Sequence, residues 1–193
     1  MIKTDTHYLN GQILLAMPSI GDSRFNKAAI FVCAHDEKGA MGIVINNVMP
    51  GLEFGSLLKD LEIESNITLP MRLNHLPVLC GGPVETARGF LIHSQDFKQP
   101  DTIEVNKDIF VTGTIDALVA LTKEDAPQNM IFALGYAGWG AGQLEKEIMD
   151  NAWLTLPATA GLVFNEKTGN IWDQGLSALG VDASKLAHLP GNA

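Results

Sequence analysis

The segment that most strongly suggests a chemical role is the glycine-rich stretch from Gly135 to Glu145, which follows an apolar run. A strand, a tight glycine turn and a helix N-terminus together expose backbone N–H groups that can hold an anion. The spacing does not fit a nucleotide site, because G-x-G-x-x-G is absent and Ala141 stands where a Walker A loop needs Lys. The structural alternative is a tight turn over 135–142, with Trp139 packed in the core and Glu145 stabilised by the helix dipole.

A second candidate is Gly21-Asp22-Ser23, which follows an apolar run and is similar to the nucleophile block of GDS-type esterases. Such enzymes also need a downstream Asp-x-x-His, and the sequence contains neither that tetrapeptide nor a G-x-S-x-G elbow. An ordinary turn at Asp22 is therefore the favoured interpretation.

A third candidate is the pair Cys33 and His35, which would share one face of a strand. Cysteine–histidine catalysis or a metal site would need further groups from Cys80, His75 or His93, and the sequence has no HExxH or Cys-x-x-Cys motif. Cys33 lies in an apolar run, so a small core residue is the favoured interpretation. We expect no metal and no cofactor.

The charge balance bears on partners. The chain has 193 residues, with 13 Lys and Arg against 22 Asp and Glu, for a formal net charge of −9. Non-specific affinity for duplexes comes from neutralising phosphates, so direct binding to nucleic acid is not expected. No targeting segment is recognisable at Met1–His7, and the longest wholly apolar run, 28–34, is too short to cross a bilayer. We expect a cytoplasmic location, no membrane association and reduced thiols.

The apolar pattern predicts the elements that must position these residues. Apolar runs with little alternation predict strands covered on both faces, and a period near 3.6 predicts amphipathic helices. Strands are expected at 13–17, 29–33, 42–45, 78–80, 89–93, 103–105, 109–111 and 130–134. Helices are expected at 54–61, 114–122, 142–149 and 171–179. These elements predict a single compact domain over 1–193 of class α+β (α/β-type), with a mixed β-sheet and about four helices.

Four blocks in order carry a family resemblance. They are 9–18 with Asp22 and Phe25; His35 with 39–42 and Asn46; 81–84 with 88–90 and His93; and 135–145 with 151–153. Together they resemble the AlgH/YqgE family over about residues 9–180, leaving a short tail at 181–193. The resemblance implies a compact α/β-type domain of the bacterial cytosol. Members are often labelled transcriptional regulators on genetic grounds, without a known DNA-binding element or established catalytic residues.

Two hypotheses follow for function. The first is a non-enzymatic binding or regulatory protein that recognises a protein or a small ligand. The second is an enzyme or cofactor binder that uses a polar cluster beside the turn at 135–145. The candidate site residues for a ligand or partner surface are His35, Asn46, Trp139, Gln143 and Glu145. If the four polar ones line one concave pocket, the second hypothesis gains support; if they are dispersed, the first does.

Overall fold

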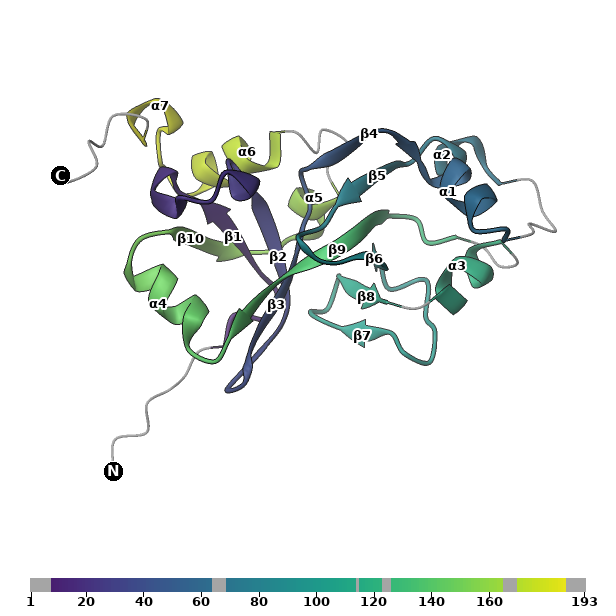
Figure 1. The fold of residues 1–193 in the computed structure, drawn as a ribbon, viewed down its shortest axis with the longest axis horizontal. Helices are drawn as coiled ribbons and strands as arrows, with labels where there is room; N and C mark the ends of the chain where they lie inside the picture. The colour runs from purple at the N-terminus through teal and green to yellow at the C-terminus, as the bar shows by residue number, and fades with distance from the viewer. Residues whose placement is uncertain (1–7, 64–68, 114, 123–125, 165–169, 187–193) are drawn as a thin grey trace.

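The structure is a computed structural model that describes residues 8–63, 69–113, 115–122, 126–164 and 170–186 (Figure 1). Its strands are β1 (Gln12–Ala16), β2 (Ala29–Asp36), β3 (Gly39–Val44), β4 (Val48–Glu53), β5 (Pro77–Cys80), β6 (Val84–His93), β7 (Ile103–Glu104), β8 (Phe110–Thr112), β9 (Met130–Gly140) and β10 (Trp153–Pro157). Its helices are α1 (Phe54–Asp60), α2 (Met71–Asn74), α3 (Ile115–Leu121), α4 (Gln143–Met149), α5 (Ala160–Val163), α6 (Ile171–Ala178) and α7 (Ala183–Leu186). Two short 3-10 turns, η1 (Pro18–Ile20) and η2 (Ser23–Phe25), follow β1.

The strands form one mixed sheet. Its order is β10-β1-β2-β3-β9-β6-β8-β7, with β5 pairing parallel to the first part of β9, and β4 pairing with β5. The other pairings among the described strands are antiparallel, so the expected mixed sheet is confirmed. In Figure 1, β9 runs through the middle of the molecule, with α4 near its end and α1–α3 beyond its start. Strand β9 therefore joins the half of the sheet formed by β10, β1, β2 and β3 to the half formed by β4–β8.

Strands β1 and β2 are buried on both faces, and for β2 the apolar run at 29–33 predicted this. Ile13 of β1 and Phe31 of β2 belong to one core cluster, whereas their neighbours Leu14 and Ile30 belong to a second cluster on the opposite face. The first cluster is completed by α6 through Trp172 and others, and the second by α4. A third cluster joins α1 and α3 to β5, β6 and β9.

The helix count differs from the expected four. The described residues contain seven α-helical segments, of which α2, α5 and α7 are single turns of four residues. Segments of one turn carry no readable 3.6-residue period, which explains why the apolar pattern indicated only the longer four. Residue 114, at the start of the second expected helix (114–122), and residues 187–193 of the expected tail lie outside the described part. None of the described helices has the length and apolar character needed to cross a membrane.

The glycine-rich turn expected over 135–142 is for the most part a strand. β9 continues to Gly140, and its last residues pair antiparallel with β3, where Gly42 faces Ala137 and Ala40 faces Trp139. Only positions 141 and 142 form the turn into α4. The glycines allow close packing and a local bend without ending the strand, because the β3 and β6 ladders satisfy the backbone.

Candidate functional site

A bend at Gly135 divides β9 into two parts with different surroundings. Gly135 has φ of 75°, and a Cβ atom there would collide with the carbonyl oxygen of Gly82. Only glycine meets both demands without strain. The bend coincides with an irregular register between β6 and β9. Beyond it, Trp139 lies beside α4, and its indole contacts Glu147 of that helix.

The Glu147 carboxylate organises the region where β9 meets α4. Its Oε2 accepts hydrogen bonds from the indole Nε1 atoms of Trp139, at 2.9 Å, and Trp153, at 2.7 Å. Its Oε1 accepts one from Gln143 Nε2 at 2.9 Å, while Gln143 Oε1 accepts the backbone N–H of Gly140 at 3.0 Å. The two indole rings pack edge to face with centroids 6.0 Å apart. Three donors thus fix the position of one carboxylate, and hydrogen bonds to a charged acceptor are stronger than those to a neutral one.

This carboxylate lines a cleft of about 570 Å³, which we name the indole cleft. Its walls come from the η1–η2 loop, the start of β6, the end of β9, α4 and β10: Ser19, Ile20, Asp22, Arg24, Phe25, Pro83, Val84, Ala137, Gly138, Trp139, Gln143, Glu147, Asp150, Ala152 and Trp153. Residues from three of the four blocks that carry the family resemblance therefore meet in one hollow.

The indole cleft carries an excess of negative charge. Asp22 and Arg24 form an ion pair at 2.6 Å, and the hydrogen bonds from Arg24 lower the pKa of the Asp22 carboxyl. That pair neutralises itself. Glu147 and Asp150 remain, and among the described residues neither forms an ion pair with a Lys, Arg or His. The cleft is therefore suited to a ligand that brings positive charge or hydrogen-bond donors.

The five predicted site residues separate into three places. Trp139 and Gln143 line the indole cleft. Glu145 lies on another side of α4, where its Oε1 is 3.1 Å from Nε2 of His35. Asn46 lies in a third place: its Oδ1 accepts the N–H of Ala29 at 2.8 Å, and its Nδ2 donates to the carbonyl of Lys27 at 2.8 Å. The four polar candidates do not line one hollow.

His35 is buried and both of its ring nitrogens have partners within the chain. Its side chain is 1% exposed, and Nδ1 accepts the backbone N–H of Leu9 at 3.0 Å. Since Nδ1 is an acceptor, the ring proton of the neutral imidazole lies on Nε2, which donates to Glu145. His35 thereby ties the segment before β1 to β2 and to α4.

Sequence reasoning missed Glu147 and Trp153 as members of the cleft. The one signal in the sequence was the spacing of four between Gln143 and Glu147, which places both side chains on one face of a helix. Trp153 stood in a segment that carried the resemblance, but spacing along the chain does not show that its indole reaches the same carboxylate as Trp139.

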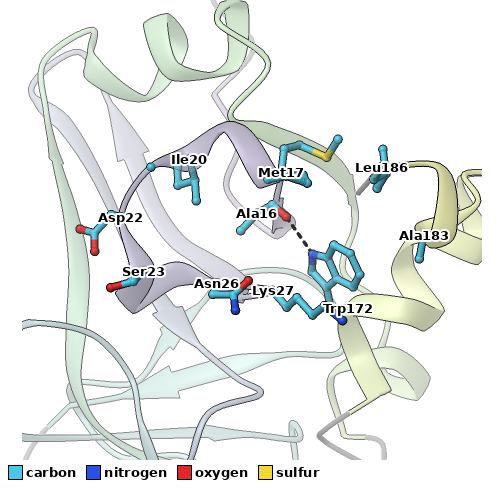
Figure 2. A pocket seen from close by; sticks show the side chains of 12 residues that line it. Ala16, Met17, Ile20, Asp22, Ser23, Asn26, Lys27, Trp172, Ala183 and Leu186 are labelled. Atoms are coloured by element: carbon cyan, nitrogen blue, oxygen red, sulfur yellow. Dashed lines mark hydrogen bonds between the residues drawn. The ribbon is translucent and has the colours of Figure 1, made fainter. Parts of the chain in front are cut away.

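A second hollow of about 460 Å³ lies on the other side of the η1–η2 loop (Figure 2). Trp172 of α6 donates from Nε1 to the carbonyl of Ala16 at 2.9 Å, and Lys27 Nζ lies 5.3 Å from the centroid of the Trp172 ring. The cation–π contact gives the amine a partner within the chain. Figure 2 shows Met17 and Leu186 at the edge of the same hollow, which is more apolar than the indole cleft.

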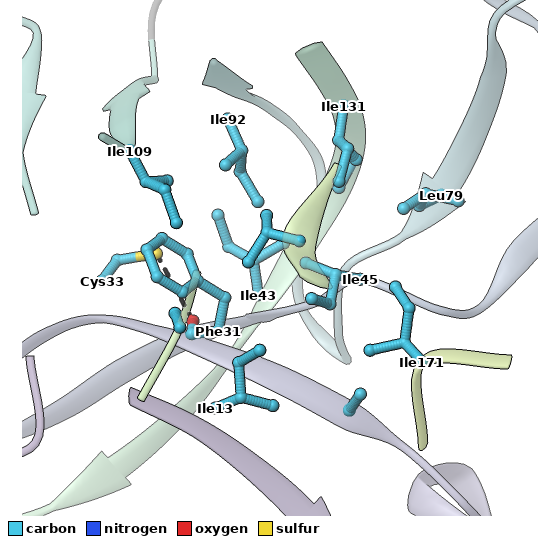
Figure 3. Packing of buried hydrophobic residues seen from close by; sticks show 14 of the residues in the cluster. Ile13, Phe31, Cys33, Ile43, Ile45, Leu79, Ile92, Ile109, Ile131 and Ile171 are labelled. Carbon is cyan, nitrogen blue, oxygen red and sulfur yellow. Dashed lines mark hydrogen bonds between the residues drawn. The ribbon is translucent and has the colours of Figure 1, made fainter. Parts of the chain in front are cut away.

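The two cysteines are free thiols in different surroundings. Cys33 is buried in the first core cluster, among Ile13, Ile43 and Ile109 (Figure 3), and burial raises the pKa of its thiol far above the usual range. A thiol held in its neutral form is a poor nucleophile, so the interpretation of Cys33 as a core residue is supported. Within the described ranges, no three His, Cys, Asp or Glu side chains gather closely enough to hold a metal ion.

Comparison with known proteins assigns the chain to a family. The family model described as DUF179: AlgH-like matches residues 13–184. A UPF0301 protein of Methylocella silvestris is 44% identical over 190 residues, covering 96% of this chain and 92% of that protein. A UPF0301 protein of Rhizobium leguminosarum is 41% identical over 194 residues, covering 99% and 96%. The chain belongs to the AlgH-like family, as its four sequence blocks predicted.

Two solved structures share the fold. The solution structure of the AlgH protein from Pseudomonas aeruginosa is similar with a TM-score of 0.76 and 35% identity, and the match covers 100% of both chains. The crystal structure of DIP2367 from Corynebacterium diphtheriae has a TM-score of 0.67 at 16% identity, covering 88% of this chain and 86% of that one. The second likeness concerns the fold alone.

Proposed function

We propose that this chain is a non-enzymatic binding protein of the cytoplasm that takes its ligand in the indole cleft. The observation that carries the proposal is the Glu147 carboxylate, held in place by Trp139, Trp153 and Gln143 at the wall of an open hollow. A carboxylate oxygen accepts about two hydrogen bonds, so Oε2 is saturated by the indoles while Oε1 has room for one donor from a ligand.

The surroundings of Glu147 Oε1 favour ligand binding over catalysis. The described lining of the cleft contains no His, Cys or Lys, and its one hydroxyl, Ser19, donates to the carbonyl of Asn151 at 3.0 Å. The ligand class that fits is a cation with several donors and an apolar body: an amine or a guanidinium, either free or on the side chain of a partner protein. Phe25 and Val84 would contact the apolar part.

The test is a titration with small amines and guanidines, followed by amide chemical shifts. We expect changes at the ends of β9 and β10, and loss of binding in Glu147→Gln, which removes the charge but keeps the shape. Glu145→Gln is the matched control, because it removes the same charge from the same helix at a side chain outside the cleft. Equal binding by Glu147→Gln, or equal loss in both variants, would defeat the proposal.

A regulatory role would then proceed through a ligand or a protein partner rather than through DNA. The support is the net charge of −9, which disfavours contact with phosphates. We expect the purified chain to bind duplex DNA no more tightly than the roughly micromolar non-specific range at physiological salt. A nanomolar complex with a defined duplex in a mobility-shift assay would contradict this.

A further inference from the structure

A third hollow, of about 430 Å³, lies at the opposite end of β9 from the indole cleft, and we name it the apolar pocket. It is lined by α1, β6, β8, α3 and the first part of β9: Leu57, Leu61, Ala87, Arg88, Gly89, Leu91, Thr112, Gly113, Ala117, Leu118, Phe132 and Leu134. Its volume falls in the range of sites for small ligands, about 300–1,000 Å³. It is independent of the function proposed above and shares no lining residue with the cleft.

The pocket has a buried apolar floor and an accessible rim. Leu91, Phe132 and Ala117 at the floor are at most 2% exposed, whereas Leu61 at the rim is 45% exposed. Gly89 lets the Phe132 ring pack directly against the β6 backbone at the floor, because a Cβ atom there would lie 2.6 Å from Cζ of that ring. Apolar surface that opens to solvent in this way is stabilised when an apolar ligand covers it.

The polar groups of the pocket are concentrated at one point. Arg88 is the one charged residue in its described lining. The Thr112 hydroxyl is already engaged, since its Oγ1 lies 2.9 Å from His93 Nε2 and 2.8 Å from Thr102 Oγ1. Arg88 Nη1 donates to Glu85 at 3.0 Å, with both side chains about half exposed.

The Arg88 guanidinium has donors to spare. It has five N–H donors, and among the described residues its one hydrogen bond goes to Glu85. It also lies over the Phe90 ring, 5.2 Å from the centroid, and a Cβ atom at Gly113, a residue of the pocket lining, would lie 3.9 Å from its Nη2. A carboxylate matches the fork of an arginine in geometry as well as in charge.

We infer that the apolar pocket binds a medium-chain aliphatic carboxylate, with the chain against Leu91, Leu118 and Phe132 and the carboxylate on Arg88. The apolar floor takes the chain, and the Arg88 N–H donors that Glu85 does not engage bind the carboxylate. A neutral chain would find the same floor but no partner for its end group.

The test uses hexanoate, octanoate and decanoate with the intact chain, by calorimetry and amide chemical shifts. We expect shifts on β6, α1 and α3, and a Kd that falls about fourfold for each added methylene group. Octanol should bind about tenfold more weakly than octanoate, because it lacks the charge-assisted bond. Equal binding of octanol, or a Kd independent of chain length, would overturn the inference.

Three variants locate the site. Arg88→Gln, at an exposed position with little effect on folding, should weaken octanoate about tenfold. Lys59→Gln on α1 removes the same charge outside the lining and should leave the Kd unchanged. Ala87→Phe places a ring at the exposed rim and should reduce binding of every chain length. Octanoate binding that survives both Arg88→Gln and Ala87→Phe would refute the site.

A further arm separates free carboxylates from membrane lipids. Sedimentation with phosphatidylglycerol vesicles should leave the chain in the supernatant, since the inference concerns a monomeric ligand in solution. Co-sedimentation that Arg88→Gln abolishes would contradict it and assign the surface to lipid headgroups instead.

Discussion

The two ends of β9 line hollows of opposite character. Before the bend at Gly135, Phe132 and Leu134 contribute to a pocket whose walls are mostly apolar. After it, Gly138 and Trp139 contribute to a cleft with carboxylates, an ion pair and two indoles. The difference shows that one strand can line two different hollows when a pairing partner changes midway: β5 pairs with the first part and β3 with the second, while β6 pairs with residues on both sides of Gly135.

The largest effect should come from removing the ring that anchors each end. Trp139 is 7% exposed and Phe132 is 2% exposed, so replacement of either by Ala should lower the free energy of unfolding by about 3–5 kcal/mol. The measurement is denaturant unfolding of the two variants. A Trp139→Ala variant as stable as the parent would mean that the indole serves only a ligand. The claim that a buried ring stabilises each end of β9 would then be wrong.

The next effect separates the two sides of α4. Glu147→Ala leaves two buried indole N–H groups without their acceptor and should cost about 2–4 kcal/mol. Glu145→Ala removes a side chain that is 42% exposed and leaves a single donor on His35, so it should cost about 1 kcal/mol. Thermal unfolding of the pair tests the order. If Glu145→Ala were the more destabilising, the indole–carboxylate group would not be what holds α4.

The smallest effect is a pH dependence specific to the apolar end. His93 is fully buried, and desolvation lowers its pKa below the usual value of 6.5. Its Nδ1 donates to the Ser94 carbonyl, so Nε2 accepts from Thr112 and the folded state holds the ring neutral. The unfolded chain takes up a proton near pH 6.5, so the stability from this residue is complete above that pH and is lost as pH falls through the folded pKa.

The check is unfolding free energy between pH 7 and 5, in the parent and in His93→Gln, where the slope should be smaller. At the polar end the hydrogen bonds from Arg24 lower the pKa of Asp22, so its contribution is complete above about pH 4 and is lost as the pH falls below that through the folded pKa. An unchanged slope between pH 7 and 5 in His93→Gln would show that the fall comes from another group.

Local patterns predicted the elements well where one principle acted alone. The burial of β2 and β3 on both faces followed from their continuous apolar runs, and α1 followed from a 3.6-residue period. The course of β9 beyond Leu134 was mispredicted as a turn, because glycines in a local sequence indicate a turn, but here this segment pairs with β3, where Gly39 faces Gly140. The partner strand, which the local sequence does not show, decides between the two.

The candidate site was predictable only in part. Trp139 and Gln143 were found because they stand in a dense motif. Glu147 was missed because its role depends on two indoles from separate segments of the chain. Both hollows at the ends of β9 are products of tertiary packing, and no spacing along the sequence encodes their walls.

The pairing of β1 with β10 has a consequence for how the chain is made. β1 is synthesised first, yet the strand on its outer edge, aligned from Gln12↔Pro157 to Ala16↔Trp153, emerges from the ribosome last. At roughly 5–20 residues per second, that edge waits on the order of ten seconds for its partner. During translation the nascent chain therefore presents an apolar strand edge, the kind of surface that chaperones cover and that neighbouring nascent chains can pair with.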